Sequence, residues 1–174
     1  MSRTRYPAGM IQIRPATVDD REALGRLGAA LMRQHHAADA RRFLTAERPE
    51  SGYGRFLVSQ IANPGALVRV AEHEDLTIGY IFAGIESTNW MELRGPCGVV
   101  HDVFVDESAR RLGAGRALMR AAIEWIYAQG RTQVVLQTKT GNEHAQALFT
   151  ALGFRKTMIE MTLDREPRTG DYRD

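Results

Sequence analysis

Apolar residues recur at helical spacing in four stretches of the chain. The first begins after Thr17, a favourable helix N-cap, and places Leu24, Leu27 and Leu31 on one face. Further helices are predicted at residues 54–61, around 118–126 and at 142–152. Glycines at positions 130 and 153 follow the last two, and a glycine is a common end for a helix.

Six runs rich in β-branched and apolar residues predict strands. They cover residues 10–14, 66–71, 78–85, 99–105, 134–138 and 154–163. A polar turn at Glu74 and Asp75 separates the second run from the third, which predicts a hairpin. No helix separates the three strands in the middle of the chain, so a doubly wound sheet is excluded. The expected fold is mixed α/β (α+β), a mixed sheet with helices on its faces.

The length of 174 residues is typical of one ordinary domain. We expect a single domain over residues 1–164 and a frayed polar tail over residues 165–174. Because 23 basic residues nearly balance 21 acidic ones, composition indicates no nucleic-acid partner. The single cysteine, Cys97, cannot form an internal disulfide, and no apolar stretch is long enough to span a bilayer. These features favour a cytoplasmic protein that does not bind a membrane.

The stretch from Val99 to Phe154 carries the candidate chemistry. Its first strand leads through a short turn to Gly113 and Gly115, where a helix begins. The first N–H groups of a helix have no intrahelical partner, and the helix dipole is positive there. Glycines allow a diphosphate to approach those amides, and arginines at positions 110, 111 and 116 add positive charge. The pattern predicts a site for a phosphate-bearing ligand.

Two other glycine-rich phosphate sites fit these residues less well. A P-loop needs lysine followed by serine or threonine after its last glycine, whereas Arg116 and Ala117 stand here. A Rossmann fingerprint needs a small residue where Leu118 stands, and an acidic residue at the end of the next strand, which has none. A tight strand-to-helix turn with solvated arginines is the alternative if the loop is taken alone.

Two motifs together resemble the GNAT superfamily of N-acetyltransferases. The first is the pattern of an arginine, two residues, a glycine, one residue and a glycine from Arg110 to Gly115, directly after a Val-Phe-Val strand. The second consists of Asn142, Ala145, Leu148-Phe149 and Leu152-Gly153-Phe154. The resemblance implies a mixed, mostly antiparallel sheet with splayed central strands, flanked by about four helices.

The resemblance also implies how acetyl-CoA would bind. Main-chain groups of the splayed strand would hydrogen-bond the pantetheine arm, as a further strand would, at Val103, Phe104 and Val105. The pyrophosphate would lie against the loop and the helix start, at Arg110, Arg111, Leu112, Gly113, Ala114, Gly115 and Arg116. Asn142 and Ala145 would line the far side of the cofactor, with Phe149 near the sulfur. An amine would then attack the thioester directly, and a backbone N–H at Val103 or Val105 would stabilise the developing oxyanion.

Two positions depart from the family's pattern. Phe149 stands where many relatives carry a tyrosine that protonates the departing thiolate, and Gln137 stands where some protein-acetylating relatives carry a glutamate base. His101 and Asp102 are the candidate catalytic residues, because a histidine can relay a proton and an aspartate can bind an ammonium or orient the histidine. Neighbours on a regular strand face opposite sides of the sheet, so both can serve only if the strand is kinked or bulged.

These observations predict an acetyl-CoA-dependent N-acetyltransferase that acts on a primary amine of a small molecule or a peptide. A protein N-terminal or lysine acetyltransferase and a non-catalytic acyl-CoA sensor are the alternatives. No metal is expected, because Cys97, His101 and Asp102 lack the spacing and ligand number of a zinc site. A homodimer through the outer strands or the closing strand, as in many relatives, is a further hypothesis. His35 and His36 stay open as a border of the acceptor pocket or an exposed helix end.

Overall fold

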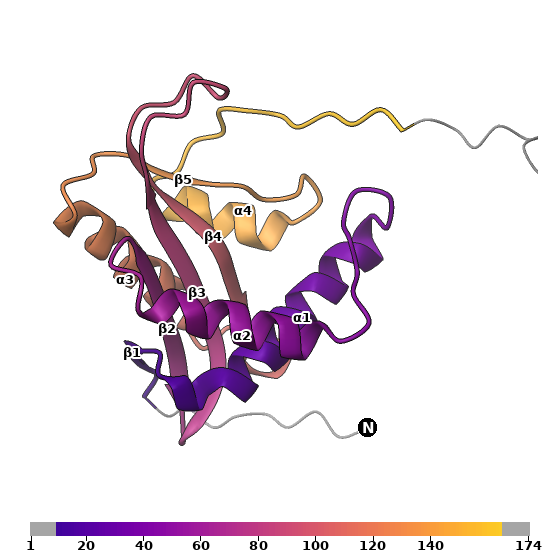
Figure 1. The fold of residues 1–174 in the computed structure, drawn as a ribbon, viewed down its shortest axis with the longest axis vertical. Helices are drawn as coiled ribbons and strands as arrows, with labels where there is room; N and C mark the ends of the chain where they lie inside the picture. Colours follow the sequence, from indigo (N-terminus) through magenta and orange to yellow (C-terminus); the bar gives the residue numbers. More distant parts are fainter. Residues whose placement is uncertain (1–9, 165–174) are drawn as a thin grey trace, which may run out of the picture.

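Along residues 10–164, two α-helices precede a central run of three strands, and two further α-helices follow it (Figure 1). This computed structural model describes residues 10–164, so the expected tail at 165–174 lies outside the described residues. The strands are β1 (Gln12–Pro15), β2 (Ala66–His73), β3 (Leu76–Glu86), β4 (Cys97–Val105) and β5 (Val134–Leu136). The helices are α1 (Arg21–Ala38), α2 (Pro49–Ile61), α3 (Ala114–Ala128) and α4 (Glu143–Ala151). Short 3-10 turns, Val18–Asp20 and Glu107–Ala109, lie before α1 and α3.

The five strands form one sheet in the order β1-β2-β3-β4-β5. The first three pairs are antiparallel, and β5 runs parallel to β4. The β2–β3 hairpin turns at Glu74 and Asp75, whose φ angles of 49° and 62° are left-handed, as a tight hairpin turn requires. The structure thus confirms the predicted mixed, mostly antiparallel sheet and its hairpin.

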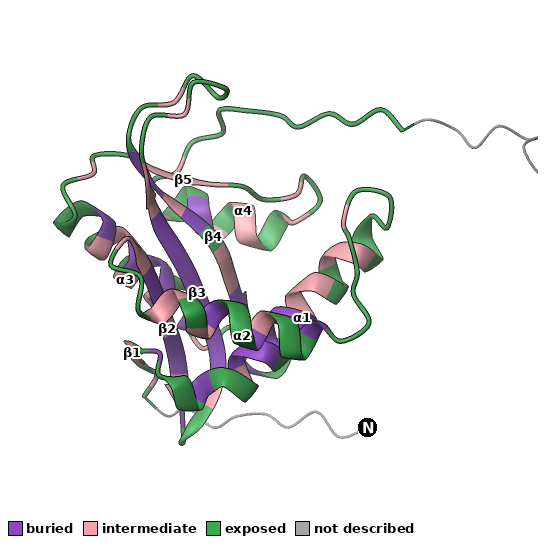
Figure 2. Cartoon of the chain, viewed as in Figure 1, coloured by how far each residue is buried: buried purple, intermediate pink, exposed green. Residues whose placement is uncertain are grey.

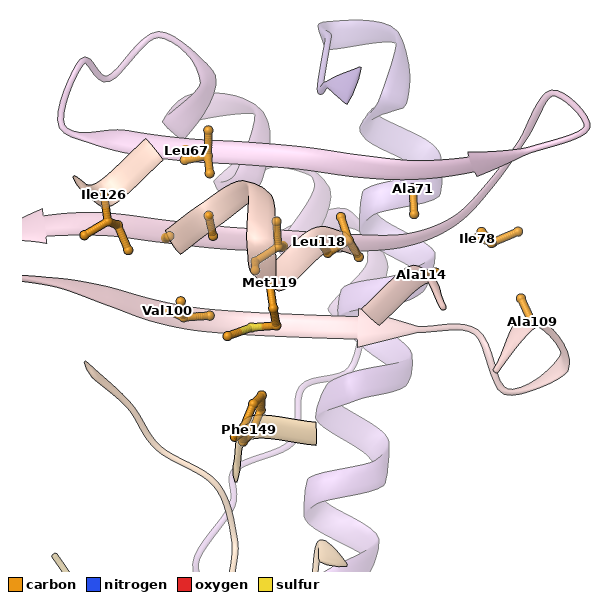
Figure 3. Packing of buried hydrophobic residues seen from close by; sticks show 13 residues of the cluster. Leu67, Ala71, Ile78, Val100, Ala109, Ala114, Leu118, Met119, Ile126 and Phe149 are labelled. Carbon is orange, nitrogen blue, oxygen red and sulfur yellow. The ribbon is translucent and has the colours of Figure 1, made fainter. Parts of the chain in front are cut away.

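Helices cover both faces of the sheet, which makes the strands the most buried part of the chain (Figure 2). On one face α1 and α2 pack on β3, where Leu24, Leu27 and Leu57 meet Tyr80 and Phe82. On the other face α3 and α4 form the cluster of Figure 3, which joins Met119 of α3, Val100 of β4 and Phe149 of α4. Within residues 10–164, none of the helices has the length and apolar character needed to cross a membrane.

An ion-pair network fixes the start of α1 against β1. Arg14 donates to both carboxylate oxygens of Asp20, at 2.7 and 2.8 Å, and to Glu72 of β2 at 2.8 Å. Asp20 also accepts from the backbone N–H of Thr17 at 2.8 Å, which confirms the N-terminal signal at this residue. Burial acts to raise the pKa of Asp20, but the hydrogen bonds from Arg14 and Thr17 outweigh it and lower that pKa.

The contact between α1 and α2 depends on glycines. A Cβ atom on Gly25 would overlap the carbonyl oxygen of Glu50, and one on Gly54 would lie 2.6 Å from the carbonyl oxygen of Arg21. Gly28 lies directly against the ring of Tyr53, with no room for a Cβ between them. The two helices therefore approach backbone to backbone, and this approach fixes the position of Tyr53.

Helix α2 begins earlier than the sequence predicted. The expected start was Gly54, whereas the helix starts at Pro49. Proline is favoured in the first helical turn, because its missing N–H would have no intrahelical partner there. The extra turn matters for function, since it brings Pro49 and Gly52 to the pocket described below.

The predicted closing strand at residues 154–163 is wrong. After Gly153 the chain carries no strand pairing, and its apolar side chains from Met158 on are exposed, from 78% at Ile159 to 99% at Leu163. Alternating residues form a strand only where a sheet edge is available, and this segment runs away from the sheet (Figure 2). Ion pairs from Glu160 to Arg42 and from Asp164 to Arg41 hold it near the loop after α1 instead.

We predict that Gly25→Ala lowers the free energy of unfolding by about 1–3 kcal/mol, the usual cost of overpacking. The added methyl group meets the backbone of Glu50, which cannot move without shifting α2. Gly52→Ala is the matched control on α2, because a Cβ there meets nothing within 4 Å. Urea denaturation of both variants should separate them, and equal stability would contradict the close contact of the two helices.

Candidate active site

A β-bulge in β4 brings His101 and Asp102 to the same side of the sheet. Phe82 of β3 pairs with Asp102, but the next residue of β3 pairs with Val100, so His101 is an extra residue in β4. The bulge reverses the alternation of the strand, because Val100 before it and Val103 after it both pack in the cluster beneath α3. The structure therefore meets the condition under which both candidate residues can serve one site.

Both residues border a pocket between the sheet and the α1–α2 pair. The pocket has a volume of about 510 Å³, within the usual range for a small-molecule site. Most of its walls are apolar or aromatic, and they come from α1, from β3 and β4, and from the first turns of α2 with the loop before it. The lining residues are Met32, Ala46, Arg48, Pro49, Gly52, Tyr53, Phe56, Phe82, His101 and Asp102.

Asp102 is a half-buried carboxylate that interacts with two tyrosines, Tyr80 and Tyr53. The hydroxyl of the fully buried Tyr80 donates to Oδ2 of Asp102 at 3.0 Å. Burial raises the pKa of Asp102, although the hydrogen bond from Tyr80 and the nearby His101 and His35 partly oppose it. Burial and the charge of Asp102 in turn raise the pKa of Tyr53 to about 12, so this phenol stays neutral. Among the described lining residues, Asp102 is therefore the one that can supply a negative charge to the pocket.

His101 lies at the exposed rim of the pocket, stacked on Phe82. The two ring centroids are 4.8 Å apart and the ring planes are inclined by 26°. Gly84 leaves space for the imidazole, since a Cβ there would lie 3.1 Å from Nε2 of His101. The ring is thus held in a fixed place while its nitrogens can reach water, as a proton relay requires.

One edge of β4 is free beside this pocket. The pairing of β4 with β5 covers Gly98 to Val100 and stops there, whereas the pairing with β3 continues to Val105. Strands β4 and β5 therefore splay apart at the bulge, as expected. Among the described strands, only β3 pairs with residues 103–105, so the other edge of this part of β4 has no strand partner. An extended ligand could hydrogen-bond this edge as a further strand does.

Helix α3 begins without a side-chain cap. Its N-cap, Gly113, has a φ of 90°, a left-handed value that glycine adopts without strain. The first intrahelical bond runs from the N–H of Ala117 to Gly113, so the N–H groups of the first turn are directed out of the helix. Arg111 and Arg116 are exposed, and neither forms an ion pair within the described part of the chain. Arg110 bonds weakly, at 3.3 Å to Gln34 and 3.4 Å to the carbonyl of Val105.

The two sequence motifs meet at the start of α3 and α4. Asn142 is the N-cap of α4, and its side-chain oxygen accepts from the N–H of Ala145 at 3.3 Å. A Cβ on Gly115 would lie 3.5 Å from the side chain of Leu148, so the first turn of α3 lies against α4. Phe149 is only 6% exposed and packs in the core (Figure 3), which gives it a structural role here.

The sequence analysis missed the aromatic residues around the carboxylate. Tyr80 and Phe82 lie in an apolar run that was predicted as a strand of a hairpin, and Tyr53 precedes the predicted start of its helix. A tyrosine in a buried strand is a usable signal, because its hydroxyl needs a hydrogen-bond partner when water is excluded. The partner, Asp102, becomes evident only from the register of β3 with β4.

The remaining polar candidates do not line the pocket. The ring of His35 contacts that of Phe43 edge-on at 4.8 Å, and Nδ1 of His36 lies 2.8 Å from the carbonyl oxygen of Phe43. Both histidines therefore hold the loop after α1. Gln137 is exposed directly after β5. Among residues 10–164 no group of three His, Cys, Asp or Glu side chains is placed to hold a metal ion.

The sequence is similar to those of known acetyltransferases. A model of the acetyltransferase (GNAT) family matches residues 29–154. Human N-acetyltransferase 8 is 32% identical over 99 residues, which cover 57% of this chain and 43% of that protein. The chain thus spans less than half the length of this curated relative.

Two solved structures have the same fold. A mutant of the BH1408 protein from Bacillus halodurans has a TM-score of 0.77 at 24% identity, covering 89% of this chain and 99% of that chain. The aminoglycoside N-acetyltransferase AAC(6')-Iy, in complex with CoA, has a TM-score of 0.69 at 20% identity, covering 92% and 96%. At these identities the likeness shows the fold alone. The family model, in contrast, spans the pocket, the bulge of β4 and the start of α3, and on this match the chain belongs to the acetyltransferase (GNAT) family.

Proposed function

We propose that this chain transfers an acetyl group from acetyl-CoA to a primary amine of a small molecule or a peptide. The bulge of β4 carries the proposal, because it puts a half-buried carboxylate and a histidine into one pocket beside a free strand edge. Membership of the acetyltransferase family supports the donor. The pocket volume of about 510 Å³ is of the size that a small molecule fills, which favours a small molecule over a protein surface.

The residues at the start of α3 fit coenzyme A. The uncapped N–H groups and the positive end of the helix suit a pyrophosphate, and Arg111 and Arg116 have no competing carboxylate in the described part of the chain. Residues 103–105 have no strand partner on the open edge of β4, so they can pair with the pantetheine arm, with Asn142 and Ala145 on the far side of the cofactor. Phe149 stands on the side of the sulfur as a buried packing residue. When bound, the cofactor supplies the acetyl thioester.

Asp102 and His101 have different roles toward the amine: Asp102 binds it and His101 removes its proton. An ammonium group can pair with the carboxylate of Asp102, which Tyr80 holds in place. The amine must lose a proton before it attacks, and His101 at the rim can pass that proton to water. Orientation of the two reactants can supply about 7–11 kcal/mol, more than general acid–base help, so the phenylalanine at position 149 is tolerated.

We predict that Gly113→Asp weakens CoA binding at least about tenfold, or about 1.4 kcal/mol. The side chain is strained at a φ of 90° and brings a negative charge to the phosphates. Gly130→Asp is the matched control, because Gly130 also has a positive φ, 73°, but lies at the other end of α3. Isothermal titration calorimetry with CoA should separate the variants. Equal CoA affinity in both would contradict the proposed phosphate site.

Replacing Asp102 by asparagine keeps its size but removes its charge. We predict that Asp102→Asn lowers kcat/KM for an accepted amine by at least about tenfold while CoA affinity stays the same, since general acid–base and ion-pair help are of this order or larger. Release of free CoA thiol measures the first quantity and calorimetry the second. Unchanged turnover would remove Asp102 from the site.

The pH profile tests the role of Tyr80 separately. Because burial raises the pKa of Asp102, the acid limb of kcat/KM should lie above the ordinary carboxyl range. The hydrogen bond from Tyr80 lowers that pKa, so Tyr80→Phe should move the limb to still higher pH. Tyr127→Phe, at an exposed tyrosine of α3, should leave the limb in place. An unmoved limb in Tyr80→Phe would rule out this positioning role.

A further inference from the structure

We propose that the pocket beside Asp102 takes a primary monoamine carried on an apolar, ring-sized body, and that Arg48 excludes amines with several positive charges. The proposal rests on the proposed function, because it names the acceptor class of the same site. It follows from the charges and the wall chemistry of the pocket.

The charges of the pocket allow one ammonium. Asp102 is the single carboxylate among the described residues that line it, and one of its oxygens already accepts from Tyr80. A second ammonium in the pocket would have no counter-charge among the lining residues. Binding it would therefore be costly, because a charge removed from water needs a partner. The lining thus matches an acceptor with one amino group.

The positive charge of Arg48 disfavours a ligand with further positive charges in the pocket. It precedes the first turn of α2 and lines the pocket, and its guanidinium has no ion pair or side-chain hydrogen bond within the described part of the chain. Arg48 is solvent-exposed, so its positive charge acts at the open part of the pocket, where it repels a further ammonium group. A repulsive group at a binding site is a common source of specificity.

The walls suit an apolar body. Phe56 meets Phe82 edge-on, with centroids 5.4 Å apart, and Phe82 stacks on His101, so aromatic faces continue from the rim toward the carboxylate. Phe56 lines the pocket and is 46% exposed, and a ring laid against it would remove that surface from water. Tyr53 and Met32 add further apolar area. A sugar-like body with many hydroxyls would find few partners here.

Three amines separate the possibilities. Phenethylamine carries one ammonium and an apolar ring, ethanolamine carries one ammonium without the ring, and kanamycin carries several ammonium groups on a polar body. With saturating acetyl-CoA, we expect kcat/KM for phenethylamine to exceed that for each of the other two at least tenfold. Calorimetry with the CoA-loaded protein measures binding of phenethylamine independently of turnover.

A charge reversal tests Arg48 directly. Arg48→Glu should raise kcat/KM for kanamycin relative to phenethylamine at least tenfold. Arg55→Glu is the control, because Arg55 lies on α2 outside the pocket, where its guanidinium donates to Ser51 at 3.0 Å. It should leave the ratio of the two amines unchanged.

The outcomes show separately whether the proposed acceptor class fails and whether the proposed acetyltransferase activity fails. Preference for kanamycin or ethanolamine, or a ratio that Arg48→Glu does not change, overturns the acceptor class while the acetyltransferase activity stands. Binding of phenethylamine without acetylation supports the class and overturns the proposed function. Absence of both binding and acetylation of phenethylamine overturns the class.

Discussion

The extra residue in β4 decides which side of the sheet every later side chain of that strand occupies. A regular strand would send His101 and Asp102 to opposite faces, and one of them would point into the core beneath α3. The bulge instead turns both toward the α1–α2 side, while Val103 returns to the core. It also coincides with the end of the β4–β5 pairing, so the same irregularity places polar side chains in a pocket and frees a strand edge beside it.

The rest of the molecule holds the two sides of that bulge in place. On one side, glycines let α1 and α2 approach closely, and this contact fixes Tyr53 in the pocket wall. On the other side, the first turn of α3 packs on α4 through Gly115 and Leu148, which leaves its N–H groups next to the free edge. Tyr80 supports the α1–α2 side from within the sheet, since its hydroxyl bonds the carboxylate while its ring packs in the core beneath α1 and α2.

Local signals in the sequence were sufficient for much of this. The N-cap at Thr17, the turn at Glu74 and Asp75, and the glycine loop before α3 each depend on a few adjacent residues, and each was predicted. The first turn of α2 was not predicted although Pro49 marks it locally, and the closing strand was predicted wrongly because a strand depends on a distant partner edge. The aromatic lining was missed for the same reason: Tyr53, Phe56 and Phe82 meet only when the α1–α2 pair lies on the sheet.

We propose that coenzyme A lies along the free edge of β4, with its sulfur facing the pocket at the bulge. A crystal structure of the protein with CoA tests it most directly. We expect the pyrophosphate on the first turn of α3, the pantetheine arm paired with residues 103–105, and the sulfur facing the pocket that Asp102 and His101 border. A sulfur that lies away from this pocket, or a CoA bound on another face of the sheet, would contradict it.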